Sequence, residues 1–351
     1  MNKYIEINNI KIGKDYPPYI VAEMSANHNG SIKNAFEIID IAKSSGSSAI
    51  KIQTYTPDTL TIKSNNSDFQ INKGLWKGKS LYDLYSSAYT PWEWHKEMFQ
   101  YANDKNITMF SSPFDRTAVD LLENINCPAY KIASFELVDI PLIKYVASTG
   151  KPMIMSTGMA NFQEIEDAVF TAKDAGCDQL ALLHCVSAYP APQNEYNLNT
   201  IPDMIDKFKL VVGLSDHTLD LSTSISSVSL GASIIEKHFT LNRDGGGPDD
   251  SFSIEPNELK YLCKSSKTVW ESLGKINYDR TPSEVENLIF RRSLYFVKDI
   301  RKGEIISDDH VRSIRPGYGM APKYLDKIIG QRVNQDISEG TRVNNNLISS
   351  K

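Results

Sequence analysis

The sequence predicts a (β/α)₈ barrel followed by a small, strand-rich domain. Short apolar runs alternate with amphipathic runs of helical length over most of the chain, which is the pattern of an α/β fold with a parallel sheet. The chain has 351 residues. A barrel of this kind takes about 250 residues, so roughly 60 to 100 remain for a second unit.

Eight apolar runs are the candidate barrel strands: Tyr19–Glu23, Ala49–Gln53, Thr108–Ser111, Ala129–Ile132, Met153–Ser156, Leu180–His184, Leu210–Leu214 and Ser233–Lys237. Helical patterns lie between most of them, namely Lys33–Lys43, Pro91–Asn103, Thr117–Glu123, Leu142–Ala147, Phe162–Ala175 and Leu221–Leu230. A doubly wound parallel sheet is the structural alternative. Such a sheet usually carries a glycine-rich phosphate loop after its first strand, whereas here a polar stretch, Met24 to Gly30, follows it.

Two segments interrupt the alternation. The segment Thr56–Thr90 is long, polar and rich in aromatic residues; long loops are usually functional or disordered, and aromatic residues argue against disorder. We interpret it as a lid over an active site or as an oligomer contact. The stretch Lys275–Glu286 is polar and is typical of a linker. The expected domains are therefore a barrel over residues 1–274, a linker over 275–289 and a strand-rich domain over 290–351.

Composition excludes several classes of partner. The formal net charge is −5 and the basic residues are scattered, which argues against nucleic acid or an anionic membrane as the main partner. No run approaches the roughly 18 apolar residues of a membrane span, and the first residues form no apolar leader. The cysteines are widely spaced without a C-x-x-C pair, as in proteins of a reducing compartment. We expect a cytoplasmic protein.

Polar residues collect at the carboxyl ends of all eight predicted strands. They are Glu23; Lys51 and Gln53; Ser111 and Ser112; Lys131, Ser134 and Glu136; Ser156; His184, Ser187 and Tyr189; Ser215, Asp216 and His217; and Glu236, Lys237 and His238. In a barrel these ends meet at one mouth, where the active sites of this fold lie. The sequence therefore predicts an active site there.

Two histidines at this mouth are candidate metal ligands. His217 and His238 each lie just past the end of neighbouring strands, so their imidazoles can converge on one divalent ion. Two histidines with oxygen or water ligands suit Mn²⁺, Co²⁺, Zn²⁺ or Fe²⁺. Two hydrogen-bonded histidines without a metal are the alternative.

The cations at the mouth indicate an anion site. Lys51 and Lys131, with the hydroxyls of Ser112, Ser134, Ser156 and Ser215, supply charge and directional donors to a phosphate or carboxylate. A fixed Glu or Asp partner for each lysine is the alternative.

Four carboxylates are candidates for acid–base work or hydroxyl recognition, Glu23, Glu136, Glu236 and Asp249. Arg315, before Pro316 in the small domain, either reaches a neighbouring site or lies in a surface turn.

The motifs then match a known family. They are Asn27-His28-Asn29-Gly30, Ile50-Lys51-Ile52-Gln53, Tyr130-Lys131-Ile132-Ala133-Ser134, Ser156-Thr157-Gly158-Met159, Gly213-Leu214-Ser215-Asp216-His217, Glu236-Lys237-His238-Phe239-Thr240 and Arg315-Pro316-Gly317. Over almost its whole length the chain resembles the sialic acid synthases, with their TIM barrel and C-terminal antifreeze-like (SAF) domain. Within the family, the runs from Gln53 to Leu60 and from Ala88 to His95, with Gly74-Leu75-Trp76, resemble the pseudaminic acid synthases.

The resemblance implies an enzyme that condenses phosphoenolpyruvate with open-chain 2,4-diacetamido-2,4,6-trideoxy-L-altrose, giving pseudaminic acid and phosphate. N-acetylneuraminate or legionaminic acid synthesis, with another acceptor, is the alternative within the family. A non-catalytic sugar- or phosphate-binding protein is the alternative from another class.

The resemblance also implies a role for each candidate residue. His217 and His238 would bind a divalent metal, with Mn²⁺ favoured over Mg²⁺ or Co²⁺, and Glu23 and Glu236 would join them in catalysis. The expected phosphoenolpyruvate ligands are Lys51, Ser112, Lys131, Ser134, Ser156, Ser187 and Ser215. The expected sugar ligands are Gln53, Glu136, Tyr189, Glu236, Asp249 and Arg315. Ser187 stands where relatives that make N-acetylneuraminate have asparagine, which fits a different acceptor. Arg315 would come from the partner subunit of a domain-swapped homodimer.

Overall fold

The computed structural model describes residues 3–349 of the chain. They form two compact units, which are described separately: the first ends at Gly274 and the second begins at Lys275. Within the described residues, no helix is both long and apolar enough to cross a lipid bilayer.

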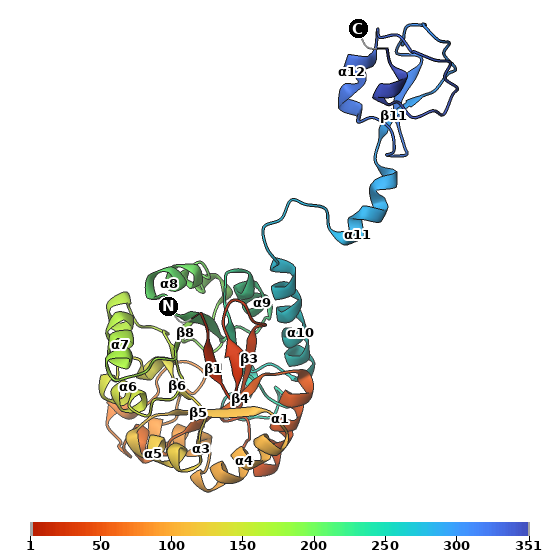
Figure 1. Ribbon diagram of the computed structural model, residues 1–351. Helices are drawn as coiled ribbons and strands as arrows, with labels where there is room; N and C mark the ends of the chain where they lie inside the picture. Colours follow the sequence, from red (N-terminus) through yellow and green to blue (C-terminus); the bar gives the residue numbers. More distant parts are fainter. Residues whose placement is uncertain (1–2, 350–351) are drawn as a thin grey trace. The chain divides into compact units, whose positions relative to one another are not determined.

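The first unit is a closed barrel of eight parallel strands, as predicted (Figure 1). The strands are β3 (Tyr19–Glu23), β4 (Ala49–Thr54), β5 (Thr108–Pro113), β6 (Tyr130–Ile132), β7 (Met153–Ser156), β8 (Leu180–Cys185), β9 (Val211–Asp216) and β10 (Ile234–His238). β10 pairs with β3 and closes the ring. Each strand begins and ends within two residues of its prediction, because each is a buried apolar run with a polar end.

Helices surround the barrel (Figure 1). They are α1 (Ile32–Ser45), α4 (Trp92–Asp104), α5 (Arg116–Asn124), α6 (Ile140–Ala147), α7 (Phe162–Asp174), α8 (Thr200–Phe208), α9 (Ser222–Ser229) and α10 (Pro256–Leu273). Local sequence sets several of their ends. The side chain of Ser31 accepts a hydrogen bond from the Asn34 amide at the start of α1, and Gly46 ends that helix at φ 94°, a conformation that favours glycine.

An antiparallel hairpin that was not predicted precedes the barrel. Its strands are β1 (Ile5–Ile7) and β2 (Ile10–Ile12). The hairpin contacts the amino ends of the barrel strands, since the Glu6 amide donates to the side chain of Gln179, just before β8. It therefore lies at the end of the barrel opposite the predicted site.

The segment between β4 and α4 is folded. It contains α2 (Pro57–Leu60) and α3 (Leu81–Ala88), and an isolated bridge joins Gln70 to Ser80. The segment follows the carboxyl end of β4, which is the end of the barrel where the site is predicted.

The second unit has a small core of its own. The unit contains α11 (Pro282–Val285), the antiparallel pair β11 (Ser293–Phe296) and β12 (Val311–Ile314), and α12 (Leu325–Ile328). Its apolar cluster consists of Leu294, Phe296, Ile300, Ile306, Val311, Ile328, Val333, Ile337 and Val343. Residues 275–287 are exposed throughout.

Candidate active site

The strand register brings the predicted site residues together at the carboxyl end of the barrel. Glu23 on β3 pairs with His238 on one side and with Lys51 on the other. Gln53, on the same strand as Lys51, pairs with Ser112 of β5. Because neighbouring strands in register point equivalent side chains to the same face, residues far apart in the sequence form one cluster.

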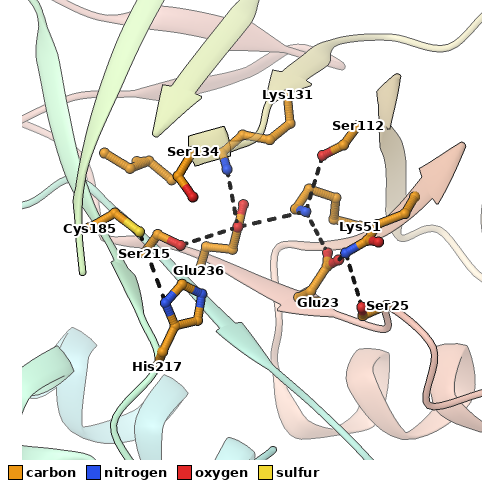
Figure 2. Close-up of polar contacts among 12 residues, drawn as sticks. Glu23, Ser25, Lys51, Ser112, Lys131, Ser134, Cys185, Ser215, His217 and Glu236 are labelled. Carbon is orange, nitrogen blue, oxygen red and sulfur yellow. Dashed lines mark hydrogen bonds and ion pairs between the residues drawn. The ribbon is translucent and has the colours of Figure 1, made fainter. Parts of the chain in front are cut away.

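Two lysines and two glutamates form the centre of this cluster (Figure 2). The Lys51 amine lies 2.7 Å from Glu23 Oε2 and 3.6 Å from Glu236 Oε1, and it donates to Ser112 Oγ at 3.3 Å. The Lys131 amine donates to Glu236 Oε1 at 3.2 Å. All four charged side chains are almost completely buried. The fixed carboxylate partners considered as the alternative for these lysines are therefore present. An ammonium has three donors, and Lys131 uses one of them on Glu236, which leaves it capacity for a bound anion.

The two glutamates are in different electrostatic environments. Burial raises the pKa of Glu23, and Lys51 opposes the shift only in part. Burial also acts to raise the pKa of Glu236, but Lys131 and Lys51 outweigh it and hold that pKa below its usual value. Environments that push the pKa values of two neighbouring acids apart are typical of acid–base sites. Of the two carboxylates, Glu23 is therefore the more basic and the better proton acceptor.

The two predicted metal histidines lie side by side. The ring centroids of His217 and His238 are 5.5 Å apart. His217 Nδ1 donates to the Val186 carbonyl at 2.8 Å. In the neutral ring the lone pair of Nε2 is then available to a metal, as in many metal-bound histidines. His238 Nδ1 is buried without a hydrogen-bond partner. These two imidazoles fit a divalent metal. No group of three or more His, Cys, Asp or Glu in residues 3–349 is arranged to hold a metal ion, so water or substrate oxygens would complete the coordination.

Other polar atoms at the same barrel end are also unpaired. Ser156 Oγ, Glu136 Oε2 and Glu236 Oε2 are buried without hydrogen-bond partners, although buried polar atoms are nearly always bonded. Burial raises the pKa of Glu136 to about 7. Ser134 and Ser187 hydroxyls are 2.7 Å apart. This concentration of unpaired donors and acceptors is what a site for a polar ligand requires.

A cavity of about 530 Å³ opens beside these residues. Its polar lining includes the predicted residues Gln53, Ser134, Glu136, Ser187, Tyr189, His238 and Asp249, together with Ser25 and Lys73. Gln53 donates to Glu23 Oε1 at 3.1 Å and to Ser25 Oγ at 3.0 Å, and Ser25 donates to Asp249. The turn after β10 therefore brings Asp249 to the mouth.

The comparison with known proteins agrees with this architecture. Residues 38–278 match the NeuB family and residues 291–347 match the SAF domain. The chain belongs to the NeuB family.

Similar members of the NeuB family include enzymes with two different named products. The pseudaminic acid synthase of Campylobacter jejuni is 41% identical over 326 residues, covering 93% of this chain and 95% of the relative. The N,N'-diacetyllegionaminic acid synthase of the same species is 37% identical over 324 residues, covering 91% and 97%. Among solved structures, the N-acetylneuraminic acid synthetase of Leptospira borgpetersenii, in complex with citrate, has a TM-score of 0.73 and 32% identity, covering 81% of this chain and 94% of that chain.

Not every polar residue at a strand end of this NeuB family barrel faces the mouth, which corrects one prediction. Lys237 and Asp216 lie on the helix-facing side, where Lys237 Nζ is 2.9 Å from Asp216 Oδ2 and Ser224 of α9 donates to Asp216. Ser111 bonds to Thr54, and His184 to the Tyr196 carbonyl. Successive side chains of a strand point to opposite faces. Neighbours of an inward residue therefore point outward.

Three residues near the site were not assigned a role from the sequence. Ser25 connects Gln53 to Asp249. The Tyr196 hydroxyl accepts from the His217 amide at 2.7 Å and donates to the Ser215 carbonyl, which fixes the backbone beside the metal histidine. Cys185 Sγ is 3.9 Å from His217 Nδ1. The His184-Cys185 pair is one of the family motifs, but the sequence gives none of these three residues a role, because their contacts span distant parts of the chain.

Arg315 lies directly after β12 in the second unit and is exposed. The other candidate site residues belong to the barrel of the first unit, whereas Arg315 belongs to the second unit. Arg315 belongs to the SAF region.

Proposed function

We propose that this chain condenses phosphoenolpyruvate with open-chain 2,4-diacetamido-2,4,6-trideoxy-L-altrose to give pseudaminic acid and phosphate. The observation that carries the proposal is the 41% identity to pseudaminic acid synthases over 93% of the chain, together with the buried lysine–glutamate cluster at the barrel mouth. The legionaminic acid synthase relative, at 37% identity, makes its acceptor the second candidate.

Phosphoenolpyruvate would bind at the lysines. Lys51 and Lys131 supply fixed positive charge, and Ser112, Ser134, Ser156, Ser187 and Ser215 supply hydroxyl donors to the phosphate and carboxylate oxygens. Ser156 Oγ, which has no partner of its own, is free to donate. The carboxylates of Glu23 and Glu236 keep the site near neutrality until the anion enters.

The acceptor would lie in the adjoining cavity, where Gln53, Glu136, Tyr189 and Asp249 present polar atoms to its hydroxyl and amide groups. C3 of the enol forms a bond to the aldehyde carbon, whose oxygen takes a proton from water and becomes a hydroxyl, and C2 is left with positive charge. Glu23 stabilises that charge and accepts a proton from the water that adds to C2. The C2–O bond to phosphate then breaks, and the C2 hydroxyl gives its proton to the departing phosphate and becomes the keto group.

His217 and His238 would hold a divalent metal, preferably Mn²⁺ with Mg²⁺ or Co²⁺ as substitutes. A metal bound there supplies Lewis-acid polarisation of the aldehyde oxygen. The unpaired Nδ1 of His238 and the fixed tautomer of His217 support this assignment.

The acceptor assay tests the proposal most directly. Phosphate release with phosphoenolpyruvate and Mn²⁺ is expected with the diacetamido altrose, and to be at least tenfold slower with N-acetylmannosamine or the legionaminic acid precursor, because a pocket shaped for one sugar discriminates by about 1–3 kcal/mol. Chelation of the Mn²⁺ should abolish phosphate release. Preference for N-acetylmannosamine would keep the family chemistry but reject this acceptor. No phosphate release with any of the three acceptors would favour the non-catalytic alternative.

We further propose a domain-swapped homodimer in which Arg315 reaches the partner's site. The connecting segment supports it, because Ile276 and Tyr278 are 93% and 99% exposed and Phe290 is 58% exposed. Large apolar side chains this exposed in one connecting segment are available for burial against a partner subunit.

Mixing two inactive variants tests the swap. Arg315→Ala and His217→Ala are each expected to be inactive alone. After exchange of subunits at equal amounts, about a quarter of the sites should combine an intact barrel with an intact Arg315, as expected for a two-fold dimer. Arg315→Ala mixed with the double variant is the matched control and should stay inactive. Failure of the first mixture to recover activity would show that Arg315 acts within its own chain.

A further inference from the structure

The segment between β4 and α4 lines one wall of the active-site cavity. From this segment, residues 56–90, the lining side chains are Leu60, Ile71, Lys73, Leu75, Trp76, Leu81, Leu84, Tyr85 and Ala88. Lys73 is the one charged member. Apart from it, this wall, which we call the apolar wall, is aliphatic or aromatic, and it belongs to the same cavity as the polar groups Gln53, Glu136, His238 and Asp249.

The apolar wall is held in place over the site. The Trp76 indole Nε1 donates to the Pro248 carbonyl at 3.0 Å, in the turn that carries Asp249. The Trp76 ring centroid is 6.0 Å from that of Tyr189. Tyr85 packs edge-on against Tyr55, at 5.9 Å between centroids, and Tyr55 packs in the same way against Phe114. The segment is thus attached to two other loops of the mouth.

The polar residues and the apolar wall favour different parts of a sugar. Hydroxyl and amide groups find partners among the polar residues. A hydroxyl against Leu75 or the face of the Trp76 ring would lose its hydrogen bonds with water and gain none, which is unfavourable. A methyl group there gains contact area instead. A cavity lined by both kinds of side chain therefore favours a sugar that places methyl groups against Leu75 and Trp76 and polar groups against the polar residues.

We propose that the apolar wall is the acceptor-specificity determinant, and that Leu75 and Trp76 bind the methyl groups of a deoxy, N-acetylated acceptor. The inference rests on the proposed function. The acceptor assigned there carries a methyl group at C6 and one on each acetamido group. N-acetylmannosamine instead has hydroxyl groups at C4 and C6, which Leu75 and Trp76 cannot satisfy, because the Trp76 indole N–H is already bonded to the Pro248 carbonyl.

Kinetics of wall variants with two acceptors test this inference. The variants are Trp76→Ala and Leu75→Ser; Leu75 is 50% exposed, so the polar substitution leaves the fold intact. We expect kcat/KM for the diacetamido altrose to fall about 10- to 100-fold, the usual effect of apolar group recognition. kcat/KM for N-acetylmannosamine should change less than about threefold, and the KM for phosphoenolpyruvate should stay constant. Ile62→Ser is the matched control, since Ile62 belongs to the same segment, is 61% exposed and lies outside the cavity lining.

The outcomes separate this inference from the proposed function. An equal loss with both acceptors would overturn it, because the wall would then only close the site. Preference of the unmodified enzyme for the legionaminic acid precursor, with the same selective loss in the variants, would reject the proposed acceptor and support the wall. Preference for N-acetylmannosamine would overturn both.

Discussion

Replacing His217 with alanine is expected to lower metal-dependent phosphate release by about a thousandfold. Polarisation of a carbonyl by a metal is worth several kcal/mol, and each 1.4 kcal/mol corresponds to a factor of ten in rate. The ring centroids of His217 and His238 are 5.5 Å apart at the barrel mouth, and on the proposed assignment removing one of them leaves a single protein ligand for the metal. Turnover and Mn²⁺ affinity should fall together, the latter measured by electron paramagnetic resonance titration.

His310→Ala is the matched control for this variant. His310 lies in the second unit, where its Nδ1 accepts from the Ser307 amide, and its loss should leave both Mn²⁺ affinity and phosphate release unchanged. If His217→Ala bound Mn²⁺ as tightly as the unmodified enzyme, the metal would have to lie elsewhere.

Replacing Lys237 with methionine should reduce the free energy of unfolding of the barrel by about 3–5 kcal/mol, the usual effect of removing one partner of a buried ion pair. The change leaves the Asp216 carboxylate buried without its cation, because Lys237 and Asp216 are 1% and 0% exposed at their side chains. Denaturation in urea, followed by a signal from the barrel, measures the loss.

The surface pair Lys207–Asp203 provides the comparison for Lys237. Its side chains are 51% and 53% exposed, so Lys207→Met should cost less than about 1 kcal/mol. Adding Asp216→Asn to Lys237→Met should recover part of the loss, since an amide needs no counter-charge. Similar losses for Lys237→Met and Lys207→Met would mean that the buried pair contributes little to stability.

The barrel could be predicted from the sequence because its strands are short, apolar and terminated by polar residues. The inward or outward direction of those residues was predictable in principle from the alternation along each strand. Glu236 and His238 point inward, so Lys237 between them points outward. Treating every strand end as part of the mouth ignored that alternation.

Other features could not be found in this way. The pairing of Lys131 with Glu236 joins residues 105 positions apart, and only closure of the barrel brings them together. The sequence of residues 56–90 fits either a lid over the active site or an oligomer contact, and only the folded chain shows that side chains of this segment line the active-site cavity. The N-terminal hairpin turns at Asn8 and Asn9, with φ of 48° and 63°; such a turn favours asparagine, but its strands of three residues are too short for a clear periodicity.

The pairing of β10 with β3 has a consequence for synthesis of the protein. As the chain leaves the ribosome, Lys51 and Lys131 emerge long before Glu236, their shared carboxylate. Without its last strand, the barrel would hold two ammonium groups with only the Glu23 carboxylate near Lys51, and an unpaired charge is costly to bury. The final strand therefore completes the ring and supplies the carboxylate between the two lysines in the same step.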